Sequence, residues 1–99
     1  MTKKELQVFE KEYKWMYTRY LFVKDCAAHR IRGWREQDAK ILYENVCGMS
    51  DIMELMLRCT HSELWASNYI LELEEEAKKE YTPITEKEAR EWKEKHAIA

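Results

Sequence analysis

Residues 28–36, with the sequence AHRIRGWRE, hold the densest group of side chains that could bind a ligand: His29, Arg30, Arg32, Trp34 and Arg35. Guanidinium groups grip carboxylates and phosphates through paired hydrogen bonds, and they stack on aromatic rings. One interpretation of this segment is therefore a binding site for an acidic protein surface or for an anionic small molecule such as a nucleotide.

The same segment has a second interpretation, as the end of a helix. Gly33 suits the left-handed position that often follows the last helical turn, and Trp34 would then pack back on that turn. Cations in the last turn complement the negative end of the helix and stabilise it by about 0.3–1 kcal/mol each. Because the three arginines exceed what a helix end requires, both interpretations stay open.

Two residues of the preceding segment extend the candidate site. Trp15 and Arg19 lie where basic and aromatic residues alternate, and an accessible tryptophan offers a flat surface for stacking. The candidate partner-binding or ligand-binding residues are therefore Trp15, Arg19, His29, Arg30, Arg32, Trp34 and Arg35.

The sequence offers no complete pattern for catalysis or for metal binding. Helical di-iron sites need Glu-x-x-His, a spacing that does not occur in the chain. Cys26 and His29 could supply two zinc ligands, with Cys47, Cys59 or His61 completing the set, or a thiol and its base. Cys26 adjoins Ala27 on the apolar seam of the first helix, which argues against both sites. The acidic run from Glu72 to Glu80 also contains lysines, which is typical of a solvated helix face. We expect no metal, no cofactor and no enzymatic activity.

The composition predicts an all-α fold in a single domain spanning residues 1–99. Two glycines and one proline leave few breaks for turns or strand ends, and good helix formers dominate the rest. No apolar run reaches the roughly 18 residues that a membrane span needs, so we expect no membrane contact. The three cysteines lack CxxC spacing and have apolar neighbours, which indicates buried, reduced thiols in a cytoplasmic protein.

Capping signals and apolar periodicity predict four helices, over about residues 3–32, 34–47, 51–80 and 86–96. Thr2 with Glu5 and Thr85 with Glu88 are capping boxes, and Gly48 is expected to stop the second helix. No Gly or Pro interrupts 51–80, so one long rod is favoured, although Thr60 and Glu63 offer a break near His61. The expected bundle has two long antiparallel helices, a short connecting helix and a short C-terminal helix.

The first helix is expected to carry two apolar faces. One seam repeats in steps of three and four through Leu6, Phe9, Tyr13, Met16, Tyr20, Val23 and Ala27. Val8, Trp15 and Phe22 form a second line at seven-residue spacing. The second line requires a partner, either another helix of the fold or another copy of the protein.

The charge distribution argues against nucleic-acid binding. The net charge is -2, with +5 in residues 1–35, -4 in residues 36–54 and -3 in residues 55–80. A reader helix over 34–47 would be acidic, which is unfavourable in a groove lined by phosphates. The polarised charge instead suits contacts within or between protein chains.

These observations favour a small cytoplasmic helical interaction protein that self-associates, as a homo-oligomer, or clamps a larger protein. Four tryptophans, six tyrosines and several arginines supply the residue types that most often contribute interface energy. An inhibitor or adaptor encoded by a phage or other mobile element would fit this description. The alternative is a helical bundle that binds an anionic small molecule through the arginines and Trp34.

Overall fold

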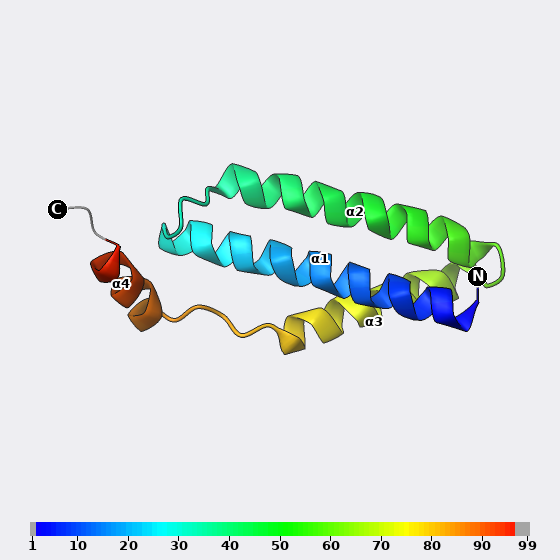
Figure 1. Ribbon diagram of the computed structural model, residues 1–99. Coiled ribbons are helices and arrows are strands. Elements are labelled where there is room, and N and C mark those ends of the chain that lie inside the picture. Colours follow the sequence, from blue (N-terminus) through cyan, green and yellow to red (C-terminus); the bar gives the residue numbers. More distant parts are fainter. Residues whose placement is uncertain (1, 97–99) are drawn as a thin grey trace.

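The computed structural model describes residues 2–96, which form four α-helices and no strand within that range. The helices are α1 (Lys3–His29), α2 (Glu36–Arg58), α3 (Glu63–Glu80) and α4 (Glu86–Lys95). The all-α class predicted from the sequence is confirmed. Helices α1, α2 and α3 pack lengthwise against one another, and α4 lies beyond the turn that joins α1 to α2 (Figure 1). The molecule is elongated, with extents of 58 × 22 × 21 Å.

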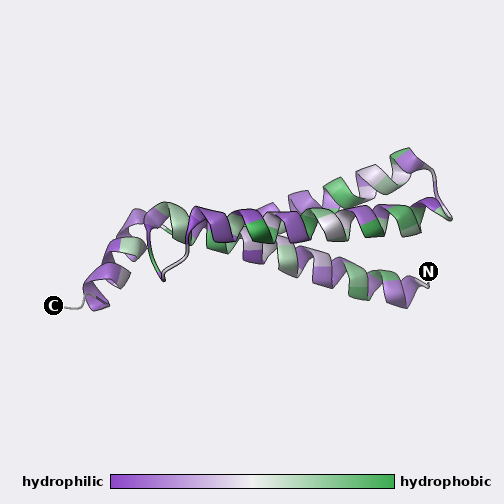
Figure 2. Ribbon diagram, turned by 90° about the horizontal axis from the view of Figure 1, so that it is seen from above, coloured by the Kyte–Doolittle hydropathy of each residue, from purple (hydrophilic) through white to green (hydrophobic). Residues whose placement is uncertain are grey.

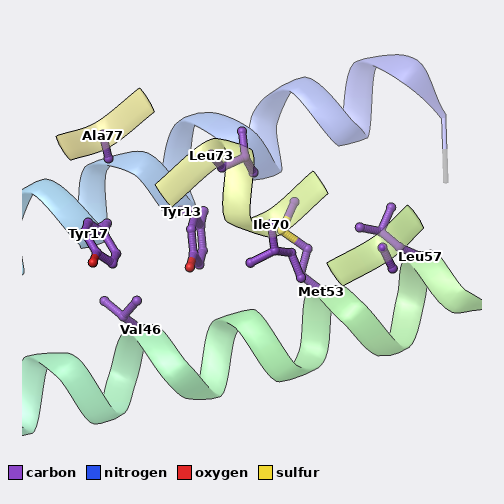
Figure 3. Close-up of a cluster of buried hydrophobic side chains, with 9 residues drawn as sticks. Tyr13, Tyr17, Val46, Met53, Leu57, Ile70, Leu73 and Ala77 are labelled. Carbon is purple, nitrogen blue, oxygen red and sulfur yellow. The ribbon is translucent and has the colours of Figure 1, made fainter. Parts of the chain in front are cut away.

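The main core lies between α1, α2 and α3. Tyr13 and Tyr17 of α1 point from one side toward Val46 of α2, and α3 closes the third side (Figure 3). The buried members are Tyr13, Tyr17, Val46, Met53, Leu57, Ala66, Ile70, Leu73 and Ala77. Polar contacts at the edge of this core join α1 to α3: the Tyr69 hydroxyl donates to the Glu10 carboxylate, and the Lys14 ammonium bridges Glu76 and Glu80.

Helix α1 begins as expected and ends earlier than expected. The Thr2 hydroxyl accepts from the backbone N–H of Glu5 at 3.1 Å, and the seam from Leu6 to Ala27 is buried or half-buried. The helix stops at His29, because Arg30 takes a left-handed conformation with φ of 56°. The N–H of Ile31 then bonds the Cys26 carbonyl and that of Arg30 bonds the Ala27 carbonyl, which is a Schellman motif.

The predicted end at residue 32, with Gly33 as the left-handed residue, is therefore wrong by three residues. Burial explains the difference. Ile31 and Cys26 are both buried and pack in the same cluster, which is the apolar contact that accompanies a Schellman motif. Ending the helix at Gly33 would abandon that contact. The left-handed backbone of Arg30 instead costs about 1–2 kcal/mol in conformational strain.

Helix α2 runs straight through Gly48, so the predicted stop at residue 47 and the restart at residue 51 are wrong. The helix begins at Glu36, where the Asp38 carboxylate accepts from the N–H of Arg35 at 2.9 Å. Val46 and Met53 are buried on either side of the glycine. The burial of these side chains against the other helices outweighs the roughly 1 kcal/mol by which a glycine in the interior of a helix destabilises that helix.

The predicted rod over 51–80 is also wrong, because the chain turns at residues 59–62. The Ser62 hydroxyl caps α3 by accepting from the N–H of Trp65 at 3.1 Å, and Thr60 does not serve as the cap. A continuous rod would carry the apolar seam of α3, which is Ala66, Ile70, Leu73 and Ala77, away from α1. Burial of that seam favours the turn. As a result the two longest helices are the consecutive α1 and α2, and the expected short connecting helix is absent from residues 2–96.

Helix α4 forms a second, smaller core with the far end of α1. Its one buried residue is Ala89, which joins Cys26 and Ile31. Phe22, Trp34, Ile84 and Trp92 pack around these three. Helix α4 therefore docks on α1 through Ala89 and Trp92.

Gly48→Ala tests whether the helix continues through position 48. No atom lies within 4 Å of the place that an added Cβ would occupy, and the backbone there is not left-handed. We expect the free energy of unfolding to rise by about 0.5–1 kcal/mol in urea denaturation, because alanine favours a helix interior. A loss of similar size would instead mean that Gly48 is a left-handed helix end.

Candidate functional site

The structure spreads the arginines of residues 28–36 around a strained turn. Arg30, Arg32 and Gly33 all have positive φ, at 56°, 59° and 74°. Arg30, Arg32 and Arg35 are exposed, whereas Trp34 is half-buried. Arginine has no preference for this backbone conformation, so its presence at two left-handed positions costs stability.

Two of the arginines contact aromatic rings within the protein. The guanidinium of Arg19 lies 5.5 Å from the centre of the Trp34 ring, and that of Arg32 lies 5.4 Å from the centre of the Phe22 ring. Cation–π contacts at such distances contribute about 0.5–1 kcal/mol at exposed sites. The structure thus brings the predicted site residues Arg19 and Trp34 together. The face of the Trp34 ring that a ligand could stack on is in contact with the Arg19 guanidinium of the same chain.

His29 belongs to a polar latch that fastens the segment after α3. The Asp25 carboxylate accepts from the Tyr81 hydroxyl and from the N–H of Ile84, each at 2.6 Å. The His29 imidazole lies 3.0 Å from the Ile84 carbonyl oxygen and 3.3 Å from the Asp25 carboxylate. Burial and the neighbouring Asp25 raise the pKa of the Tyr81 phenol, which therefore stays protonated and donates. The latch positions α4.

The cysteines do not form the reactive or metal-binding set that the sequence left open. Cys26 is fully buried, and this burial raises the pKa of its thiol, which disfavours the reactive thiolate. Cys47 and Cys59 are exposed, so the expectation that all three thiols are buried is wrong. Within residues 2–96, no three His, Cys, Asp or Glu side chains lie close enough to hold a metal ion.

Trp15 lies far from the arginine turn, on an uncovered part of α1. Its side chain is 64% exposed, and Val8, one heptad earlier, is 58% exposed. Phe22, one heptad later, is half-buried beside α4. The second apolar line of α1 therefore has an internal partner at its C-terminal end only.

Helix α2 carries an exposed apolar group that the sequence interpretation missed. Ile41, Ile52, Leu55 and Met56 are between 42% and 58% exposed. The buried residues of this part of α2 are their neighbours Met53 and Leu57. If the heptad pattern of α2 is continued through Gly48, this exposed apolar line appears two residues after the buried line that contains Val46 and Met53.

These side chains point away from the three-helix core, and most of them lie on the side of the α1–α2 pair opposite α3, with Leu55 at its edge. Glu10 and Lys14 mark the side of α1 that binds α3, and Val8 and Trp15 lie about 100–160° around the helix from them.

On α2, Cys47 and Glu54 line a groove shared with α3. Ile52 and Met56 lie about 140–180° around the helix from them. We call the surface formed by Val8, Trp15, Ile41, Ile52, Leu55 and Met56 the outer face. Figure 2, viewed from the α2 side, shows hydrophobic residues recurring along the whole helix.

Two grooves flank Tyr43, and neither is lined by the predicted site residues. One lies between α2 and α3, with Tyr13 among its lining residues and acidic residues along it. The other lies between α1 and α2, where Tyr20, Lys24 and Lys40 are among the lining residues. Binding of an anionic ligand by the arginine turn stays a prediction.

Within residues 2–96, no helix combines the length and the hydrophobicity that crossing a bilayer requires. Comparison of the chain with protein families, with curated proteins and with solved structures gave no match.

Arg30→Gly tests whether the arginine at the end of α1 serves the fold. Glycine adopts the left-handed conformation without strain, so we expect the free energy of unfolding to rise by up to about 1 kcal/mol in urea denaturation. A loss of stability would show instead that the Arg30 side chain itself holds the turn.

Asp25→Ala tests the latch. Two donors lose their acceptor, so we expect the docking of residues 81–96 to weaken by about 1–3 kcal/mol. Faster proteolysis between residues 81 and 85 and a shift of the Trp92 emission would report the release. The control is Glu75→Ala, which removes only an exposed ion pair with Lys78 and should leave the cleavage rate unchanged. An equal cleavage rate in the wild type and in Asp25→Ala would contradict the role of the latch.

Proposed function

We propose that this protein is a helical protein–protein interaction module and that the outer face is its binding surface. The observation that carries the proposal is that α2 is apolar on two opposite sides. One side packs into the core through Val46 and Met53, and the other presents Ile52 and Leu55 to solvent. A helix that is apolar on two sides needs two partners, and the described residues supply one.

The dimensions of the molecule support this proposal. Its radius of gyration is 16.6 Å, whereas a compact chain of 100 residues has about 13 Å. Its accessible surface is 7514 Å², against about 6,000 Å² for a typical monomer of this mass. The surplus of about 1,500 Å² exceeds the roughly 800 Å² that one partner contributes to a standard interface.

The composition of the outer face also fits an interface. Trp15 is a large, rigid side chain, and tryptophan is among the residues that most often dominate binding energy. Isoleucine, leucine and methionine surround it, which suits an amphipathic helix as the bound element. The helix would come from a second copy or from a larger protein on which this chain acts as an inhibitor or adaptor. Three free cysteines agree with a reducing, cytoplasmic setting.

The double variant Ile52→Glu with Leu55→Glu tests the function. Both side chains are exposed, so the isolated fold should survive, while two charges on the outer face should abolish binding. Gel filtration with light scattering, on the purified chain and on extracts of the native cells, should find the wild type above its monomer mass of 12.1 kDa and the variant at that mass. Wild type that is monomeric in both samples, or a complex that the variant leaves intact, would refute the proposal.

A further inference from the structure

Helix α2 carries a heptad seam along the outer face. Residues in steps of four and three, all exposed, make up this outer seam: Ile41, Asn45, Gly48, Ile52, Leu55 and Cys59. Alternating steps of four and three are the pattern by which one helix packs along another. The outer seam lies two residues, or about 200°, from the buried seam through Val46 and Met53.

We propose that the occupant of the outer face is a second copy of this chain, paired antiparallel through α2 about a two-fold axis at Ser50. This inference rests on the proposed function and names its partner. In that arrangement outer-seam positions whose numbers add up to 100 face each other, and positions on the flank that holds Glu44 pair when their numbers add up to 102. Ile41 then faces Cys59 of the second copy, Asn45 faces Leu55, and Gly48 faces Ile52.

The spacing of the outer seam is the first argument for a second copy. All six of its positions find a seam position opposite them when the axis lies at Ser50. A two-fold interface must be self-complementary in this way, and a seam of alternating four-residue and three-residue steps permits it.

Charge complementarity is the second argument. Glu44, Asp51 and Arg58 are exposed along one edge of the outer seam at seven-residue spacing. The antiparallel pairing sets Glu44 against Arg58 of the second copy, and the two-fold axis repeats this pair. Asp51 meets its own equivalent near the axis, so two attractive pairs stand against one repulsive pair. A parallel pairing would set this edge against Leu42, Met49 and Met56, with no opposite charge.

The position of Trp15 is the third argument. Helices α1 and α2 are antiparallel, and Tyr20 lies against Tyr43 with ring centres 5.1 Å apart. Counting back along α1 and forward along α2 places Trp15 level with Gly48, within one turn of the axis. Trp15 thus lies near the centre of the interface, where the residues that dominate binding energy concentrate. Helices α1 and α2 with their copies would form a four-helix bundle.

Sedimentation of the purified full-length chain tests the dimer. We expect about 24 kDa, twice the 12.1 kDa of one chain, at micromolar concentration. Ile52→Glu with Leu55→Glu should raise the dissociation constant at least 100-fold while far-UV circular dichroism stays helical. The matched control is Leu64→Glu, which places the same charge on α3 at a leucine that is 71% exposed and should leave the dimer intact. A wild type that remains 12.1 kDa at high concentration would overturn the inference.

Disulfide trapping tests the orientation, in a Cys47→Ser background. Ile41→Cys should cross-link with the native Cys59 of the second copy under mild oxidation, because facing seam positions lie within disulfide reach. Without that substitution no dimer should be trapped, since the two Cys59 residues would be about 27 Å apart along the axis. Trapping through Cys59 alone would indicate a parallel dimer and overturn the arrangement.

The two proposals can fail separately. If the purified chain is monomeric, but chain from native cells runs in a larger complex that Ile52→Glu with Leu55→Glu abolishes, the outer face binds a different protein. The interaction function then stands and the second copy is refuted. If neither sample shows an assembly that depends on the outer face, both proposals are refuted.

Discussion

The structure depends on the mismatch in length between α3 and the pair of helices that it covers. Helix α3 has 18 residues and is about 27 Å long, whereas α1 and α2 have 27 and 23 residues, or about 40 and 35 Å. A single short helix buries one side of the pair over part of its length. Helix α4 covers the far end through Ala89 and Trp92, and the side opposite α3 keeps its apolar residues in solvent. The elongated shape follows from this difference in length. The outer face follows from the position of α3 on one side of the pair, which leaves the opposite side without a covering helix among the described residues.

The arginine turn illustrates how local signals are overridden by packing. Gly33 is suited to a left-handed helix end, yet Arg30 takes that position because Ile31 gains burial beside Cys26. Burial of an isoleucine contributes about 1.5–3 kcal/mol, which exceeds the strain of one left-handed arginine. The side chains that looked most like a binding site are partly engaged with Trp34 and Phe22. The outer face, made of ordinary apolar residues, is the stronger candidate.

The sequence supported the helical class, the capping boxes at Thr2 and Thr85 and the buried seam of α1. It could not place the turn between α2 and α3, because Gly48 suggested a break that packing overrides. Ser62 is a suitable N-cap for α3, but the absence of Gly and Pro from residues 51–80 favoured a continuous helix more strongly. Trp15 is exposed, in agreement with a second apolar line of α1 that requires a partner. The sequence alone does not distinguish the exposed Ile52 and Met56 of α2 from core residues. One residue separates them from the buried Met53 and Leu57, and only the tertiary packing distinguishes the two lines.

The short connection between α1 and α2 also bears on how fast the chain folds. Residues 30–35 bring two long helices together as an antiparallel hairpin, and α3 returns after a turn of only four residues. Most residue contacts of the chain lie within its helices and are therefore local in sequence. Helical bundles with such low contact order fold in microseconds to milliseconds. The monomer would reach its native shape well before two copies meet at cellular concentrations, so the outer face would be complete and accessible during that interval.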